Sequence, residues 1–131
     1  MNICGGEKYI LRNDTIALPV EISGLPDTFN AEGEVLLGKS SYHVTLVALG
    51  KIKEKYDIKA EDFIEKATKL FCEYIKTNDV SLVNYRDEFY FVQDERGRKT
   101  IVVMCDISKL NGYFDIFNKE FGIRYKKRGL F

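Results

Sequence analysis

Several residue types are scarce in this 131-residue chain, which has one histidine, three cysteines and two prolines. A single histidine, and cysteines that do not follow a metal-ligand spacing, make a zinc site of the common kinds unexpected, so we expect no metal and no cofactor. The cysteines Cys4, Cys72 and Cys105 cannot all pair with one another. The sequence therefore favours free thiols in a reducing compartment.

An excess of charge of one sign and long apolar runs are also missing. Twenty lysines and arginines balance twenty aspartates and glutamates, so any binding to nucleic acid or membrane must come from a local patch. No apolar run approaches the length of a membrane span, and residues 1–8 lack the apolar core of a signal peptide. We expect a cytoplasmic protein without a membrane partner.

The length fits one domain over residues 1–131, long enough to bury a core. Apolar alternation and β-branched residues predict strands at 15–22, 34–37, 40–50, 80–85, 88–92 and 100–105. With two helices, this order predicts an α+β protein with an antiparallel-rich sheet of about five or six strands and both helices packed on one face. The charged residues 51–59 are interpreted as a connector.

The two helices are predicted from apolar residues at helical spacing. The first begins near Ala60, runs about five turns, and has an apolar face of Phe63, Ala67, Leu70, Phe71 and Tyr74. In the second helix Ser108 is the expected cap and Gly122 the expected end. Its predicted buried face consists of Leu110, Tyr113, Phe114, Phe117 and Phe121.

The stretch from Ser40 to Gly50 holds the only histidine. Because side chains alternate along a strand, His43, Thr45, Val47 and Leu49 are predicted on one face and Tyr42 on the other, in the core. The imidazole exchanges a proton near neutral pH, and the hydroxyl can donate to an anionic oxygen. Without further context, a lone histidine at the start of a strand is more often a packed or surface residue than a catalytic one. For Thr45, an ordinary strand residue and a phosphate donor are equally good interpretations.

Three features together resemble the two-histidine phosphoesterases, the group that includes 2′-5′ RNA ligase-like proteins and cyclic phosphodiesterases. Residues 16–19, Ile-Ala-Leu-Pro, are similar to the opening strand of that family. Residues 43–46, His-Val-Thr-Leu, are similar to the first of its two His-x-Thr/Ser motifs. The order of elements that follows also agrees with the family, over nearly the whole chain.

One departure from the family pattern concerns the second motif. The family carries a second His-x-Thr/Ser on a strand after the last helix, whereas this sequence has no second histidine and stops at Phe131. We expect either that the natural protein continues beyond this residue or that the chain is a degenerate member of the family.

The resemblance implies a metal-independent enzyme that opens or forms phosphodiester linkages at the ribose 2′ position. Its expected substrates are RNA ends or small nucleotides with a 2′,3′-cyclic phosphate or a 2′-5′ linkage. His43 would be one acid/base group and Thr45 one phosphate ligand. Lys39, Lys51, Arg124 and Lys126 are candidate substrate-binding cations, although a solvated surface role is the better explanation for each of them. The aromatic residues Tyr85, Phe89, Tyr90 and Phe91 could offer a base-stacking surface, but core packing is favoured for most of them.

Two other functions remain open at this point. A non-catalytic member of the fold that binds RNA or a nucleotide would account for the missing second histidine. An α+β interaction domain in which the histidine is incidental would account for the composition alone.

Overall fold

The computed structural model describes residues 1–20, 28–31, 34–37, 42–93 and 99–126, and it describes side chains over 1–20, 43–84 and 105–126. The strands are β1 (Asn2–Ile3), β2 (Tyr9–Arg12), β3 (Thr15–Val20), β4 (Thr28–Ala31), β5 (Glu34–Leu37), β6 (Tyr42–Ala48), β7 (Leu82–Gln93) and β8 (Lys99–Ile107). The helices are α1 (Leu49–Lys55), α2 (Phe63–Ile75) and α3 (Leu110–Phe121).

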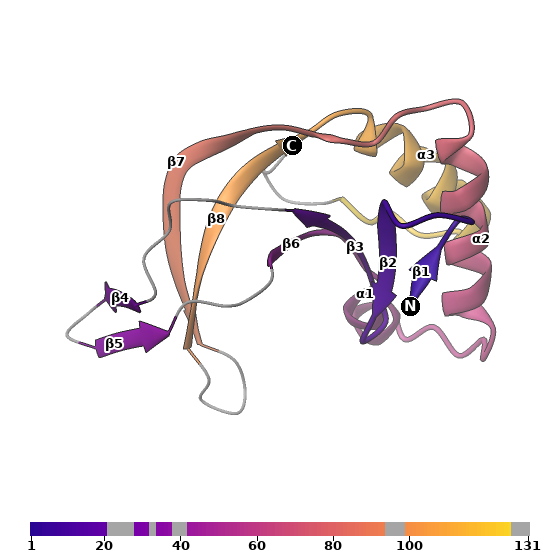
Figure 1. Ribbon diagram of the computed structural model, residues 1–131. Helices are drawn as coiled ribbons and strands as arrows, with labels where there is room; N and C mark the ends of the chain where they lie inside the picture. The colour runs from indigo at the N-terminus through magenta and orange to yellow at the C-terminus, as the bar shows by residue number, and fades with distance from the viewer. Residues whose placement is uncertain (21–27, 32–33, 38–41, 94–98, 127–131) are drawn as a thin grey trace.

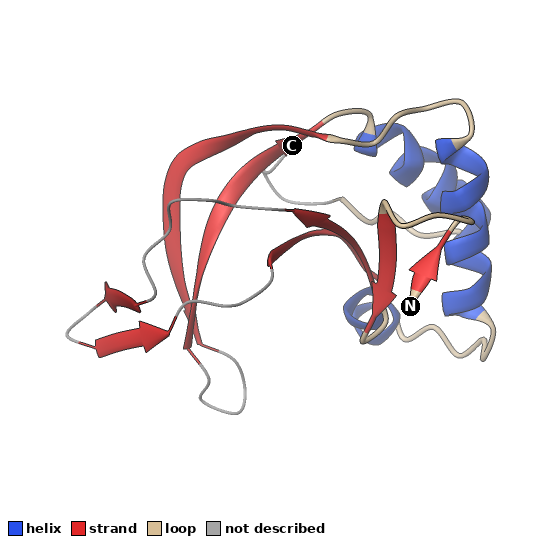
Figure 2. Ribbon diagram, in the orientation of Figure 1, coloured by secondary structure: helices blue, strands red, loops and turns tan. Residues whose placement is uncertain are grey.

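The strands pair antiparallel throughout the described residues. The largest sheet has the order β1-β2-β3-β6, while β4–β5 and β7–β8 are two-stranded hairpins. Helices α2 and α3 gather at one end of the molecule, and the β7–β8 ribbon curves away from them (Figures 1 and 2). The predicted α+β class is confirmed. The described strands divide among three sheets, which the sequence pattern did not indicate.

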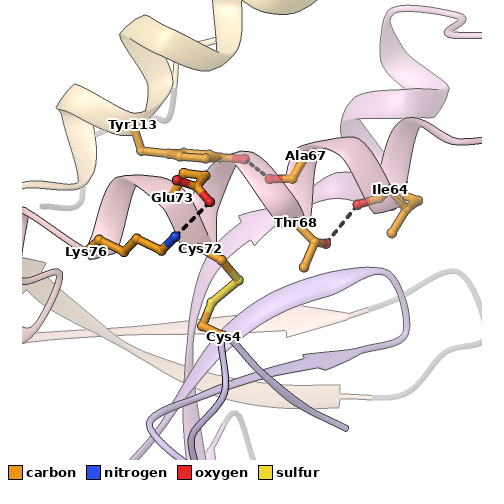
Figure 3. Close-up of a disulfide and its surroundings, with 8 residues drawn as sticks. All are labelled: Cys4, Ile64, Ala67, Thr68, Cys72, Glu73, Lys76 and Tyr113. Atoms are coloured by element: carbon orange, nitrogen blue, oxygen red, sulfur yellow. Dashed lines mark hydrogen bonds and ion pairs between the residues drawn. A yellow bond between two sulfur atoms is a disulfide. The ribbon is translucent and has the colours of Figure 1, made fainter.

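Aromatic rings join the large sheet to the two helices. Phe71 of α2 contacts Tyr9 of β2 at a ring-centroid distance of 5.1 Å and Tyr113 of α3 at 5.3 Å. The hydroxyl of Tyr113 donates to the carbonyl of Ala67 at 2.9 Å (Figure 3). Burial raises the pKa of Tyr113, so this hydroxyl keeps its proton and remains a donor. All four residues are buried, and the helix faces predicted for α2 and α3 are confirmed at these positions.

Helices α2 and α3 approach each other closely at Gly112. The hydroxyl of Tyr74 donates to the carbonyl of Lys109 at 2.6 Å. A Cβ atom added at Gly112 would lie 2.3 Å from that hydroxyl oxygen. Glycine in a helix interior is ordinarily unfavourable, and here it is required because the tyrosine occupies the space of a side chain. Gly122 ends the helix in a left-handed conformation with φ of 64°, as predicted.

Several predictions of local structure are wrong. Helix α2 has 13 residues instead of about five turns, and the single strand β7 replaces the two strands predicted at 80–85 and 88–92. Residues 49–55 form α1 instead of the strand end and connector, because Leu49 and Ile52 are buried one turn apart. Ser108 does not cap α3 with its side chain. Its hydroxyl instead donates to the carbonyl of Asp79 at 2.9 Å and accepts from the amide of Ser81 at 3.2 Å.

The predicted cysteine state is also wrong. Cys4 and Cys72 form a disulfide with a Cα–Cα distance of 5.0 Å. The fold places the turn after β1 against the third turn of α2, so two cysteines 68 residues apart in sequence become neighbours (Figure 3). Cys105 is buried on β8 and takes no part in this bond.

Candidate functional site

The candidate site lies on β6, an outer strand of the four-stranded sheet within the described residues. Strand β3 is its neighbour, with Pro19 opposite His43 and Ala17 opposite Thr45. The β2–β3 pairing ends at Ala17, so Pro19 lies beyond β2, where the missing amide hydrogen interrupts no β2–β3 pairing. Strand β3 is therefore paired on one side only at this proline, the kind of edge position where a sheet tolerates proline.

His43 and Thr45 are both exposed, whereas Val44 between them is half-buried and packs against the core. Strand alternation explains this pattern, because residues two apart point to the same face. Leu46 is fully buried on the opposite face. The predicted adjacency of the imidazole and the hydroxyl is thus present in the structure, on a strand whose other face belongs to the core.

The predicted alternation fails directly after Thr45. The pairing register shifts between Ile16 and Ala17, so that Leu46 on β6 has no opposite residue on β3. Val47 is consequently fully buried beside Leu46, although it was predicted to share the face of His43. An extra residue of this kind bends a strand and re-aims its side chains. The bulge therefore limits the exposed face to the first half of β6.

Two of the predicted substrate-binding lysines, Lys39 and Lys51, flank β6 in the sequence. Lys51 lies on α1 and is exposed. Because His43 is near the start of β6 and α1 begins after Ala48, about 15 Å of strand separates His43 from the start of that helix. Lys51 therefore lies beyond the far end of β6, away from the His43 imidazole. Lys39 falls outside the described residues.

Arg124 and Lys126 follow α3 on a segment held by one side chain. The amide nitrogen of Asn118 donates to the carbonyl of Tyr125 at 2.7 Å, and its oxygen accepts from the Tyr125 amide at 3.0 Å. The Tyr125 ring packs against Phe114 at 5.1 Å. Arg124 and Lys126 are exposed on either side of this half-buried tyrosine.

The surroundings of Tyr125 also relate this segment to α1. Burial raises the pKa of Tyr125, and the nearby Tyr56 hydroxyl raises it further. Tyr56 directly follows α1. The two predicted cations after α3 therefore lie on a segment that is fixed at Tyr125.

Five aromatic residues named from the sequence lie outside the described side chains: Tyr42, Tyr85, Phe89, Tyr90 and Phe91. Their packing in the core or stacking on a base stays a prediction. Within the residues described, no group of three histidine, cysteine, aspartate or glutamate side chains is arranged to hold a metal ion. No helix there is long and apolar enough to cross a membrane.

One functional feature missed from the sequence is the bulge at Leu46. A signal for it is present, since the strand ends in consecutive apolar residues where a regular half-buried strand would alternate.

Comparison of the chain with protein-family models, with curated proteins and with solved structures found no match.

Proposed function

We propose that the His43–Thr45 face of β6 binds a phosphodiester and acts on it without a metal. The expected substrate is a 2′,3′-cyclic phosphate or a 2′-5′ linkage at an RNA end or in a small nucleotide. The observation that carries this proposal is that both side chains are exposed on the same side of a strand, next to the core residues Val44 and Leu46.

The packed face of β6 holds the backbone of the strand in place. The Cα–Cβ bonds of His43 and Thr45 therefore point to the same side of the strand before a ligand arrives. A fixed donor near a phosphate oxygen stabilises developing negative charge without reorganisation. In this arrangement Thr45 holds a nonbridging oxygen, and His43 gives or takes the proton at the ribose oxygen.

The number of histidines favours a second candidate function. Opening a cyclic phosphate by general acid–base catalysis uses one group to accept a proton and another to donate one, and this chain has one histidine. A binding domain that recognises the phosphate with His43 and Thr45, without turnover, needs no second histidine.

The two functions are separated by measuring binding and turnover on the same protein. A short RNA that ends in a 2′,3′-cyclic phosphate is titrated, and its opening is followed by chromatography. If the protein is an enzyme, His43→Ala lowers the rate about 10²- to 10⁴-fold. If it is a binding domain, wild-type protein binds without turnover, and binding weakens as salt concentration rises.

Matched variants make this experiment specific. Thr45→Val removes the hydroxyl at the site, while Thr15→Val removes a hydroxyl from the adjacent strand β3, where Thr15 bonds locally to the Asn13 carbonyl. We expect weaker phosphate binding from the first and unchanged binding from the second. Equal binding by wild-type protein, His43→Ala and Thr45→Val would contradict both functions.

The cytoplasmic location remains a prediction. Disulfides such as Cys4–Cys72 persist mainly in oxidising compartments, so the redox behaviour of this pair bears directly on it.

A further inference from the structure

The disulfide between Cys4 and Cys72 attaches the first turn of the chain to α2 (Figure 3). Cys4 follows the two-residue strand β1, and Cys72 lies within the helix. Cys4 adopts a left-handed backbone conformation with φ of 61°, which is unfavourable for a residue with a side chain. The bond therefore ties to α2 the turn of residues 4–7, which follows β1 and lies outside the strands.

The Cys4–Cys72 bond lies at the boundary between the core and solvent. Both cysteines are half-buried and pack against the core. Apart from their chain neighbours, no atom lies within 4 Å of a Cβ built on Gly5 or Gly6, the two residues after Cys4. Cys105, by contrast, is 8% exposed. Since thiol–disulfide exchange depends on access to the sulfur, the reactive position is the Cys4–Cys72 pair.

Non-covalent contacts hold the next part of the chain independently of the disulfide. The Lys8 ammonium donates to the Asp79 carboxylate at 2.5 Å and to the Ser81 hydroxyl at 2.7 Å. The Tyr9 hydroxyl donates to the Val80 carbonyl at 2.7 Å. Strand β1 pairs with β2, with Ile3 opposite Tyr9, and Ile3 is buried in the core. Both strands therefore stay attached when the disulfide is broken, and only the turn of residues 4–7 loses its connection to α2.

We propose that Cys4–Cys72 is a reversible redox site whose reduction loosens the turn of residues 4–7 and leaves β1, β2, β3 and β6 in place. The reductant is a small dithiol or a glutathione-type thiol. Its thiolate attacks one sulfur to form a mixed disulfide, and a second thiolate displaces the protein sulfur. Two electrons and two protons reach the protein as two cysteine thiols, and the reductant leaves as a disulfide.

The first test measures backbone motion in the folded protein. Amide order parameters are recorded by NMR for the oxidised protein and for protein reduced with dithiothreitol. We expect the order parameters of residues 4–7 to fall from about 0.85 to below about 0.6 on reduction, while those of Ile16 and Leu18 on β3 stay near the rigid value. Unchanged order at residues 4–7, or an equal loss at Ile16 and Leu18, would overturn the proposal.

The second test measures reversibility by trapping thiols with a maleimide across glutathione redox buffers. Wild-type protein and Cys105→Ala should pass between a fully oxidised and a fully reduced pair while still folded. Cys4→Ser and Cys72→Ser should show the loosened turn of residues 4–7 in every buffer. A native protein that stays fully oxidised in excess reduced glutathione, or never forms the bond in excess oxidised glutathione, would overturn the proposal.

Discussion

The α2–α3 layer and the first half of β6 differ in how their side chains are used. In the helical layer, aromatic rings contact one another in series, from Tyr9 through Phe71 and Tyr113 to Phe117. On β6, His43 and Thr45 are exposed. The difference teaches that stability and the candidate chemistry reside in separate side chains, so each can be changed without the other.

The largest loss of stability is expected from Phe71→Ala. Phe71 is fully buried and contacts rings on both β2 and α3. Its removal should lower the free energy of unfolding by about 3–5 kcal/mol, measured by urea denaturation. The control Ile116→Ala, at a residue of α3 that is 43% exposed, should change it by less than about 0.5 kcal/mol. Similar losses from the two variants would contradict the role given to the aromatic layer.

The next loss is expected from Cys72→Ser. Breaking a cross-link between residues 68 positions apart increases the freedom of the unfolded chain and should lower stability by about 2–4 kcal/mol. The free energy of unfolding is measured by chemical denaturation under reducing and under oxidising conditions. The variant should be insensitive to reductant, and wild-type protein should match it once reduced. A wild-type protein whose stability does not depend on reductant would count against the bond.

A smaller loss is expected from Gly112→Ala. Alanine normally stabilises a helix by about 1 kcal/mol relative to glycine, but a Cβ here would meet the Tyr74 hydroxyl at 2.3 Å. We therefore expect a loss of about 1–3 kcal/mol from overpacking, measured by thermal unfolding. Adding Tyr74→Phe should recover part of it. A stabilising effect of Gly112→Ala would show that the helices do not meet closely at this point.

The smallest effect on stability is expected at the candidate site. Since His43 and Thr45 are exposed, His43→Ala and Thr45→Val should each change the free energy of unfolding by less than about 0.5 kcal/mol. Chemical denaturation of both variants beside wild-type protein checks this. Losses comparable to that of Gly112→Ala would indicate that the pair is structural, and the comparison between the two regions would fail.

The features that the sequence predicted are local ones. The helical spacing from Leu110 to Phe117 and the terminating Gly122 depend on residues within a few turns, and α3 follows them. Similarly, the exposure of His43 and Thr45 follows from strand alternation over three residues. Periodicity and turn chemistry therefore account for the parts that were right.

The features that were missed depend on contacts distant in sequence. The Cys4–Cys72 pair exists only because the sheet places the start of the chain against α2, which no spacing reveals. The bulge at Leu46 depends on its pairing with β3. Helix α1 is short and lacks a side-chain cap, although the spacing of Leu49 and Ile52 was a usable signal for it.

The most direct test of the central claim uses the fact that His43 is the only histidine. Its imidazole gives a single set of NMR signals, which can be followed while a 2′,3′-cyclic nucleotide is added. If the exposed face of β6 binds the phosphate, the imidazole signals should shift and saturate, and Thr45→Val should require more ligand for the same shift. Imidazole signals that stay in place at every ligand concentration would contradict the claim.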